Sequence, residues 1–160
     1  MDPNKLESLI EQRLRILGII CAALGGSVFI SAAIAWLLLA QGAIGPGEEG
    51  SQLPILPTVL AALGFSALVV APKISSMVLG SGGGHEENPE QTLQRYQTSV
   101  IAGFAVRESA AIFGLVATFL TGNMVWVAAL AVAAALAMIS GWPRKQALLS
   151  ALKTGPTPIG

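Results

Sequence analysis

Charge is what this sequence most lacks. Only 11% of its 160 residues are Asp, Glu, Lys or Arg, whereas a soluble domain carries about a quarter. The formal net charge is zero, so nothing in the composition indicates the basic surface of a nucleic-acid-binding protein. Hydrophobic residues make up 53% of the chain and the mean hydropathy is +0.68. The composition therefore indicates a membrane protein.

Side chains that ligate metals or carry out catalysis are also scarce. The single cysteine, Cys21, lies inside an apolar run, so an intrachain disulfide is excluded and we expect it to be a small packing residue. The single histidine, His85, lies in a glycine-rich stretch, which excludes haem held by two histidines of one chain. The segment His85-Glu-Glu is interpreted as a solvated loop rather than a metal site. No phosphate-binding loop, nucleophile elbow or paired intramembrane acids are present. We expect no enzyme, cofactor or metal.

Long apolar runs dominate what remains. Each is close to the roughly 20 residues that cross about 30 Å of hydrocarbon as a helix. They cover about 16–40, 55–74, 98–121 and 124–142. The first is too long for the apolar region of a signal peptide and is expected to be retained. The sequence thus predicts an all-α polytopic membrane protein, with residues 1–160 as one integral membrane domain of four transmembrane helices in two hairpins.

Residues that favour the start or the end of a helix mark the limits of these segments. Asp2 and Asn88 each precede a proline, the pattern of a cap followed by the first helical residue. The helix that begins after Asp2 is expected to be an amphipathic lead-in along the membrane surface. Gly122 suits a left-handed helix end and Asn123 the cap of the next helix. The third and fourth spans are therefore expected to form a tight antiparallel hairpin.

Three tryptophans and a group of leucines are expected to lie at the membrane interface. Trp36, Trp126 and Trp142 lie close to predicted span ends, where the indole ring prefers to sit, so they are expected to anchor the interface. Beyond the fourth span, an interfacial amphipathic helix is predicted, with a frayed tail as the alternative. Its apolar face would carry Leu148, Leu149 and Leu152.

Basic residues predict the orientation. They precede the first span, lie between the second and third, and follow the fourth: Lys5, Arg13, Arg15, Lys73, Arg95, Arg144, Lys145 and Lys153. The segment 41–54 has two acids and no basic residue. The positive-inside rule then places both termini and the middle loop in the cytoplasm of a cell-membrane protein.

One pair of charges interrupts the third apolar run. Arg107 and Glu108 are adjacent and about ten residues, or roughly 15 Å, into the span. A charge at the centre of a membrane costs at least about 2.5–3.5 kcal/mol. Arginine reaches the headgroups along its stem, but glutamate is too short. We expect Glu108 to be satisfied inside the bundle by Arg107 or a partner's arginine, or by a hydroxyl of Ser109, Thr118 or another helix.

The segment ESAAIFGLVATFL, residues 108–120, resembles the carboxylate-bearing helix of rotary ATPase proteolipids, the c-subunits. In that helix the essential acid is followed in register by Ile-Tyr-Gly-Leu-Val. The matching positions are Glu108, Ile112, Phe113, Gly114, Leu115 and Val116. The resemblance covers about one span of four, and it implies that Glu108 carries a proton or sodium ion through the membrane.

These patterns favour a non-catalytic structural or accessory component of a membrane assembly, with Arg107 and Glu108 as a buried charged pair. Its expected partners are membrane lipids and either other membrane subunits or further copies of itself. Two alternatives stay open. One is an ion-translocating subunit that uses Glu108, and the other is a membrane protein that binds a lipid or small molecule.

Overall fold

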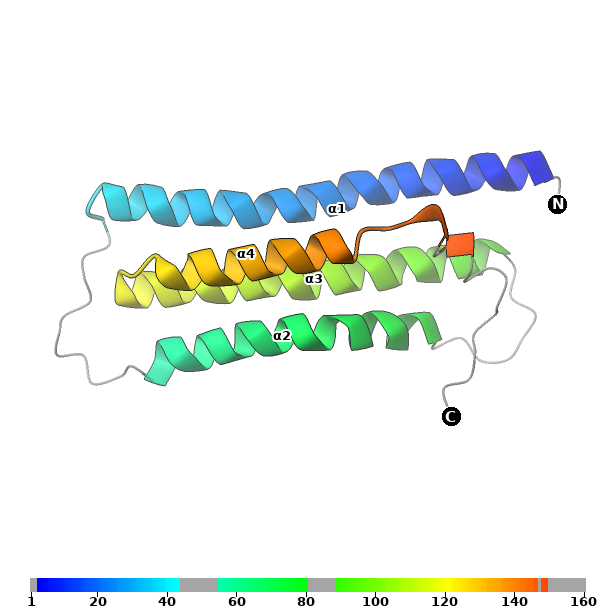
Figure 1. The fold of residues 1–160 in the computed structure, drawn as a ribbon. Helices are drawn as coiled ribbons and strands as arrows, with labels where there is room; N and C mark the ends of the chain where they lie inside the picture. The colour runs from blue at the N-terminus through cyan, green and yellow to red at the C-terminus, as the bar shows by residue number, and fades with distance from the viewer. Residues whose placement is uncertain (1–2, 44–54, 81–88, 147, 150–160) are drawn as a thin grey trace.

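A computed structural model describes residues 3–43, 55–80, 89–146 and 148–149. Within these ranges the chain is helical and contains no strand, which confirms the all-α class. Four helices follow one another along the chain (Figure 1): α1 Pro3–Ala40, α2 Ile55–Gly80, α3 Pro89–Thr121 and α4 Val125–Ser140.

Three of these helices, α1, α2 and α3, are long and apolar enough to cross a membrane, which supports a membrane protein. The fourth, α4, is apolar but has 16 residues, a length of about 24 Å. The expected span 124–142 is longer than this helix. The helix ends at Ser140, two residues before the expected end of the span. The four-span prediction is therefore not confirmed by helix length alone.

Consecutive helices run in opposite directions, with α3 at the centre of the bundle (Figure 1). The central helix α3 packs against the other three, and α1 and α2 lie on opposite sides of it. Helices α3 and α4 are neighbours joined by three residues. The expected grouping into two hairpins is not confirmed, because α1 packs mainly on α3 and α4 rather than on α2.

The lead-in before the first span is part of α1 itself. This helix has 38 residues, about 57 Å at 1.5 Å per residue, and it continues through the expected boundary near Ile16 (Figure 1). No glycine or proline stands between Asn4 and Leu17 to break it. The two expected caps at Asp2 and Asn88 lie outside the described residues.

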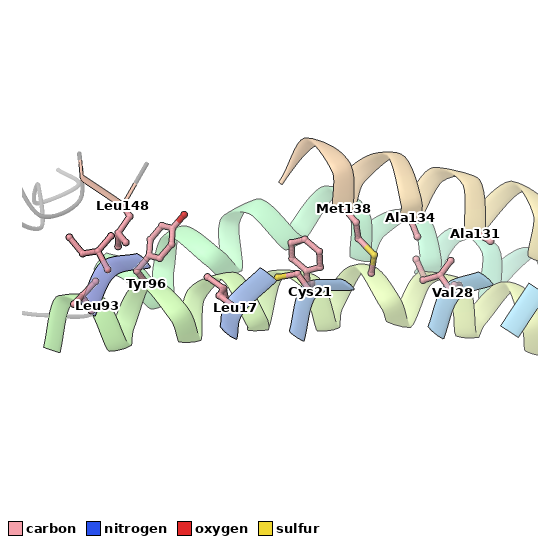
Figure 2. Close-up of a cluster of buried hydrophobic side chains, with 13 residues drawn as sticks. Leu17, Cys21, Val28, Leu93, Tyr96, Ala131, Ala134, Met138 and Leu148 are labelled. Carbon is pink, nitrogen blue, oxygen red and sulfur yellow. The ribbon is translucent and has the colours of Figure 1, made fainter. Parts of the chain in front are cut away.

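The buried core joins α1 to α3 and α4 (Figure 2). Its α1 and α4 members recur at three-, four- and seven-residue spacings, as packed helix faces do. They are Ile10, Leu17, Cys21 and Val28 from α1, and Ala131, Ala134 and Met138 from α4. Cys21 is fully buried, so its interpretation as a packing residue is confirmed. At the end of the bundle where α1 begins, Leu148 is buried near Leu93 and Tyr96, while Leu149 is exposed.

Glycine permits the closest approach between α3 and α4. A Cβ at Gly114 would lie 3.0 Å from Leu130 Cβ, the Trp126 carbonyl oxygen and Val127 Cα. Backbone cannot move away as a flexible side chain does, so a larger residue would separate the helices. The close packing of α3 on α4 explains why a glycine stands at position 114.

The turn between α3 and α4 confirms Gly122 as a left-handed helix end, whereas the N-cap of α4 is Met124, one residue after the expected Asn123. Gly122 has a φ of +65°, and its N–H donates to the Thr118 carbonyl over 2.8 Å. The Asn123 side chain still accepts the Val125 N–H over 3.0 Å, as a capping residue does. Thr118 Oγ1 accepts the Val127 N–H over 3.1 Å and donates to the Asn123 carbonyl over 3.2 Å. Thr118 thus stabilises the turn.

Candidate functional site

The charged pair of α3 is split between two neighbouring helices. Consecutive residues of an α-helix point about 100° apart, so adjacent side chains contact different surroundings. Glu108 contacts α1, whereas Arg107 lies against the end of α4. The ion pairs of the described residues join Lys145 to Glu7 and Glu11, and none joins Arg107 to Glu108.

Glu108 is satisfied by a hydroxyl of another helix, one of the alternatives expected from the sequence. Ser27 Oγ of α1 donates to Glu108 Oε1. The same hydroxyl lies 2.7 Å from the Leu24 carbonyl oxygen. Ser109, a donor considered above, instead bonds the Val106 carbonyl over 2.6 Å in its own helix. The acid therefore links α1 to α3 about midway along the bundle.

Arg107 is buried, with 8% of its surface exposed. Its Cζ lies 5.7 Å from the centroid of the Phe104 ring, within the range of a cation–π interaction. The guanidinium also packs against Gly141, where a Cβ would lie 2.5 Å from Nη1. Gly141 caps the carboxyl end of α4, and that end of a helix attracts a cation through its dipole.

The surroundings of Arg107 leave its buried Nε without a partner among the described residues. A buried hydrogen-bond donor without a partner costs about 1–3 kcal/mol of stability. The ring of Phe104 and the end of α4 thus hold the charge, but the described side chains do not complete its hydrogen bonds.

Serines also join α3 to α2. Ser99 Oγ donates to the Ser75 carbonyl oxygen over 2.6 Å. A Cβ at Gly103 would overlap Ser75 Oγ, so the glycine allows the two helices to approach. Sequence reasoning missed Ser27 and Ser75 as partners of α3. The available signal was that Ser27 lies inside the first apolar run and Ser75 directly follows the second, because small hydroxyl residues in such positions often bond across helices in a membrane.

Polar contacts gather at the end of the bundle where α1 begins. Lys145 Nζ donates to Glu7 Oε1 over 3.0 Å and lies 3.8 Å from Glu11 Oε1. The hydrogen bond to Glu7 and its negative charge raise the pKa of Lys145. Arg13 Nη1 donates to Gln97 Oε1 over 3.4 Å. These exposed contacts attach the segment after α4, and α3, to the start of α1.

The three tryptophans lie near helix ends. Trp36 is four residues before the end of α1, and Trp126 is the second residue of α4. Both belong to the end of the bundle away from the start of α1 (Figure 1). Trp142 follows α4, which ends about midway along the bundle (Figure 1), and its ring meets that of Phe104 edge-on with centroids 6.3 Å apart. Trp36 and Trp142 are exposed, at 63% and 43%.

Comparison with protein-family models, curated proteins and solved structures finds no match for this chain. Its functional interpretation therefore depends on the geometry of α3 and its neighbours.

Proposed function

We propose that this protein is a non-catalytic structural or accessory component of a membrane assembly, built from four membrane-spanning helices. The observation that carries the proposal is the hydrogen bond from Ser27 to Glu108. It gives the one acid in the middle of the third span a partner in the first, as an acid that maintains the bundle requires. Polar interhelical contacts of this kind stabilise membrane bundles.

The proposal includes two further points: α4 is a fourth membrane span, and the protein has a defined orientation in the membrane. Helix α4 is apolar along its length, and Trp126, near its start, suits a membrane interface. Because the helices alternate in direction (Figure 1), the basic residues near the helix ends lie at one end of the bundle. They are Arg13, Lys73, Arg95, Arg144 and Lys145. The positive-inside rule makes that end cytoplasmic.

Accessibility labelling tests the topology. Ala43→Cys and Glu90→Cys place single thiols at exposed positions at opposite ends of the bundle, in a Cys21→Ala background. An impermeant maleimide added to intact cells should label the first and not the second. Labelling of both, or of the second alone, would overturn the proposed orientation.

Ion translocation by Glu108 is a second candidate, and one observation favours it. The Ser27 hydroxyl has one hydrogen but lies against two acceptors, Glu108 and the Leu24 carbonyl. A carboxylate accepts that hydrogen, whereas a carboxylic acid donates its own to Ser27, which then donates to Leu24. The contact thus suits both forms of Glu108, as reversible proton binding requires.

Two measurements separate these functions. Native mass spectrometry in detergent should show a defined small oligomer or a mixed complex if the protein is an accessory component. A closed ring of many copies would favour the ion carrier. In proteoliposomes, Glu108→Gln should change no proton or sodium flux if the acid is structural. Selective modification of Glu108 by dicyclohexylcarbodiimide, with protection by sodium or high pH, would refute the structural function.

A further inference from the structure

Arg107 lies beside an apolar groove between α1 and α4. The groove has a volume of about 320 Å³, at the small end of the range for ligand sites. Small residues of α1 make room for it. The residues that line it are Cys21, Ala22, Gly25, Gly26, Phe29, Phe104, Ala135, Met138, Ile139 and Trp142. Figure 2 shows two of them, Cys21 and Met138, close together between the helices.

Arg107 is not itself among the residues that line the groove, but its guanidinium lies next to residues at the groove's edge. Phe104 and Trp142 both line the groove, and Arg107 lies over the ring of Phe104 and against Gly141, the residue before Trp142. The α1 wall extends from Cys21 to Phe29, about 12 Å along the helix. A cation therefore lies beside the part of the apolar groove that Phe104 and Trp142 form.

A cation beside an apolar groove is complementary to a phospholipid, which joins an anionic headgroup to apolar chains. Arg107 is more than nine-tenths buried, and its Nε lacks a partner among the described residues. The neighbouring acid, Glu108, is bonded to Ser27 instead. Arginine binds phosphate through charge-assisted, often bidentate hydrogen bonds, and basic pockets between membrane helices bind anionic headgroups. The groove offers hydrocarbon contact beside the charge.

We propose that Arg107 and the α1–α4 groove form a binding site for one anionic phospholipid. The phosphate binds the guanidinium of Arg107, and the first part of one acyl chain lies in the groove along Cys21 to Phe29. The lipid comes from the leaflet at the end of the bundle where α1 begins, and its phosphate is drawn below the level of the other headgroups to reach Arg107, as local thinning of the bilayer around a membrane arginine allows. Trp142, which is 43% exposed, covers the approach to Arg107 and moves aside when the headgroup binds.

The test is lipid retention by the full chain in native mass spectrometry. The detergent-solubilised protein receives equal amounts of dioleoyl phosphatidylglycerol and dioleoyl phosphatidylcholine, which share their acyl chains. The wild type should retain one phosphatidylglycerol in preference to phosphatidylcholine. Arg107→Gln should lower that preference about tenfold, the loss expected for a hydrogen-bonded charge. Arg144→Gln, which removes an exposed charge outside the groove, should leave it unchanged.

A matched pair of glycine substitutions tests the acyl-chain half of the site independently of Arg107. A Cβ at Gly26, which lines the groove, and one at Gly18, which does not, would each meet no atom within 4 Å. Gly26→Leu should fill the groove and abolish retention, whereas Gly18→Leu should preserve it. Circular dichroism confirms that each variant is folded. If Arg107→Gln fails to fold, the glycine pair alone decides the outcome.

Three results would overturn the proposal. One is equal retention of the two lipids by the wild type, and another is equal loss in both glycine variants. The third is full displacement of phosphatidylglycerol by millimolar inorganic phosphate, which would make Arg107 a site for a soluble anion. A groove that instead binds a second copy of the chain would appear as a dimer that Gly26→Leu dissociates without changing the retained lipid, and this result also contradicts the proposal.

Discussion

Removal of the Ser27 hydroxyl should destabilise the bundle more than removal of the acid that it contacts. In Ser27→Ala, Glu108 loses the hydrogen-bond donor that α1 supplies. In Glu108→Leu, the Ser27 hydroxyl keeps the Leu24 carbonyl at 2.7 Å, and a leucine suits the surrounding hydrocarbon. Ser27→Ala should therefore cost more than Glu108→Leu, because Ser27 keeps a second acceptor, the Leu24 carbonyl, when Glu108 is removed.

The magnitude is set by two competing effects. A stranded buried acceptor costs about 1–3 kcal/mol, but interhelical polar contacts in membranes average about 0.6 kcal/mol with a maximum near 1.7. Because Glu108 is only partly buried, we expect Ser27→Ala to cost about 1–2 kcal/mol. Glu108→Leu should cost less than 1 kcal/mol, and the double variant should reveal a coupling of about 0.6–1.7 kcal/mol.

Equilibrium unfolding in mixed micelles, with increasing dodecyl sulfate and helix content followed by circular dichroism, measures these differences. Ser31→Ala is the matched control, because Ser31 donates only to the Ser27 carbonyl of its own helix, over 2.9 Å. A Ser27→Ala cost no larger than that of Ser31→Ala, with a coupling below about 0.3 kcal/mol, would refute the reasoning.

Further predictions concern the helix contacts and the ion pair at the start of α1. Gly114→Ala should cost about 1–3 kcal/mol in the same unfolding assay, because its methyl group meets α4 backbone at 3.0 Å; Gly18→Ala, in open space, should not destabilise the protein. Gly122→Ala should cost about 1 kcal/mol because of its φ of +65°. The raised pKa of Lys145 means that its pairing with Glu7 stabilises the fold below the pH at which an unfolded lysine titrates. That contribution should disappear as the pH rises through the folded pKa, and Glu7→Gln should lower the pKa measured by NMR.

Local signals predicted the parts of the fold that depend on neighbouring residues. The turn at Gly122 and Asn123 was predicted because a left-handed glycine and a capping amide act within a few residues. The apolar runs located α1, α2 and α3 because their length and hydropathy are properties of one segment. The end of α4 was placed too late, since Gly141 and Trp142 continue the apolar pattern although the helix has ended.

The sequence alone could not predict which residues contact Arg107 and Glu108. Ser27 is 81 residues from Glu108, and its selection depends on how α1 rotates against α3. Gly141 meets Arg107 only because α4 ends level with that residue of α3. The sequence did identify both charges as groups that need partners, because an intramembrane charge is costly whatever surrounds it. It left open whether Arg107 and Glu108 satisfy each other.

An exchange of the two charges tests that remaining point. If Arg107 and Glu108 formed a simple ion pair, Arg107→Glu combined with Glu108→Arg would preserve it and largely restore stability. In this structure the exchange places a carboxylate against the carboxyl end of α4, whose dipole repels it, and over the face of Phe104, which favours a cation. It also places a long arginine beside the Ser27 hydroxyl in a space that accommodates a glutamate. We therefore expect the exchanged protein to unfold at lower dodecyl sulfate than either single variant. Recovery to near the wild-type midpoint would show that the two charges interact mainly with each other, and the assignment of each to a different helix would be wrong.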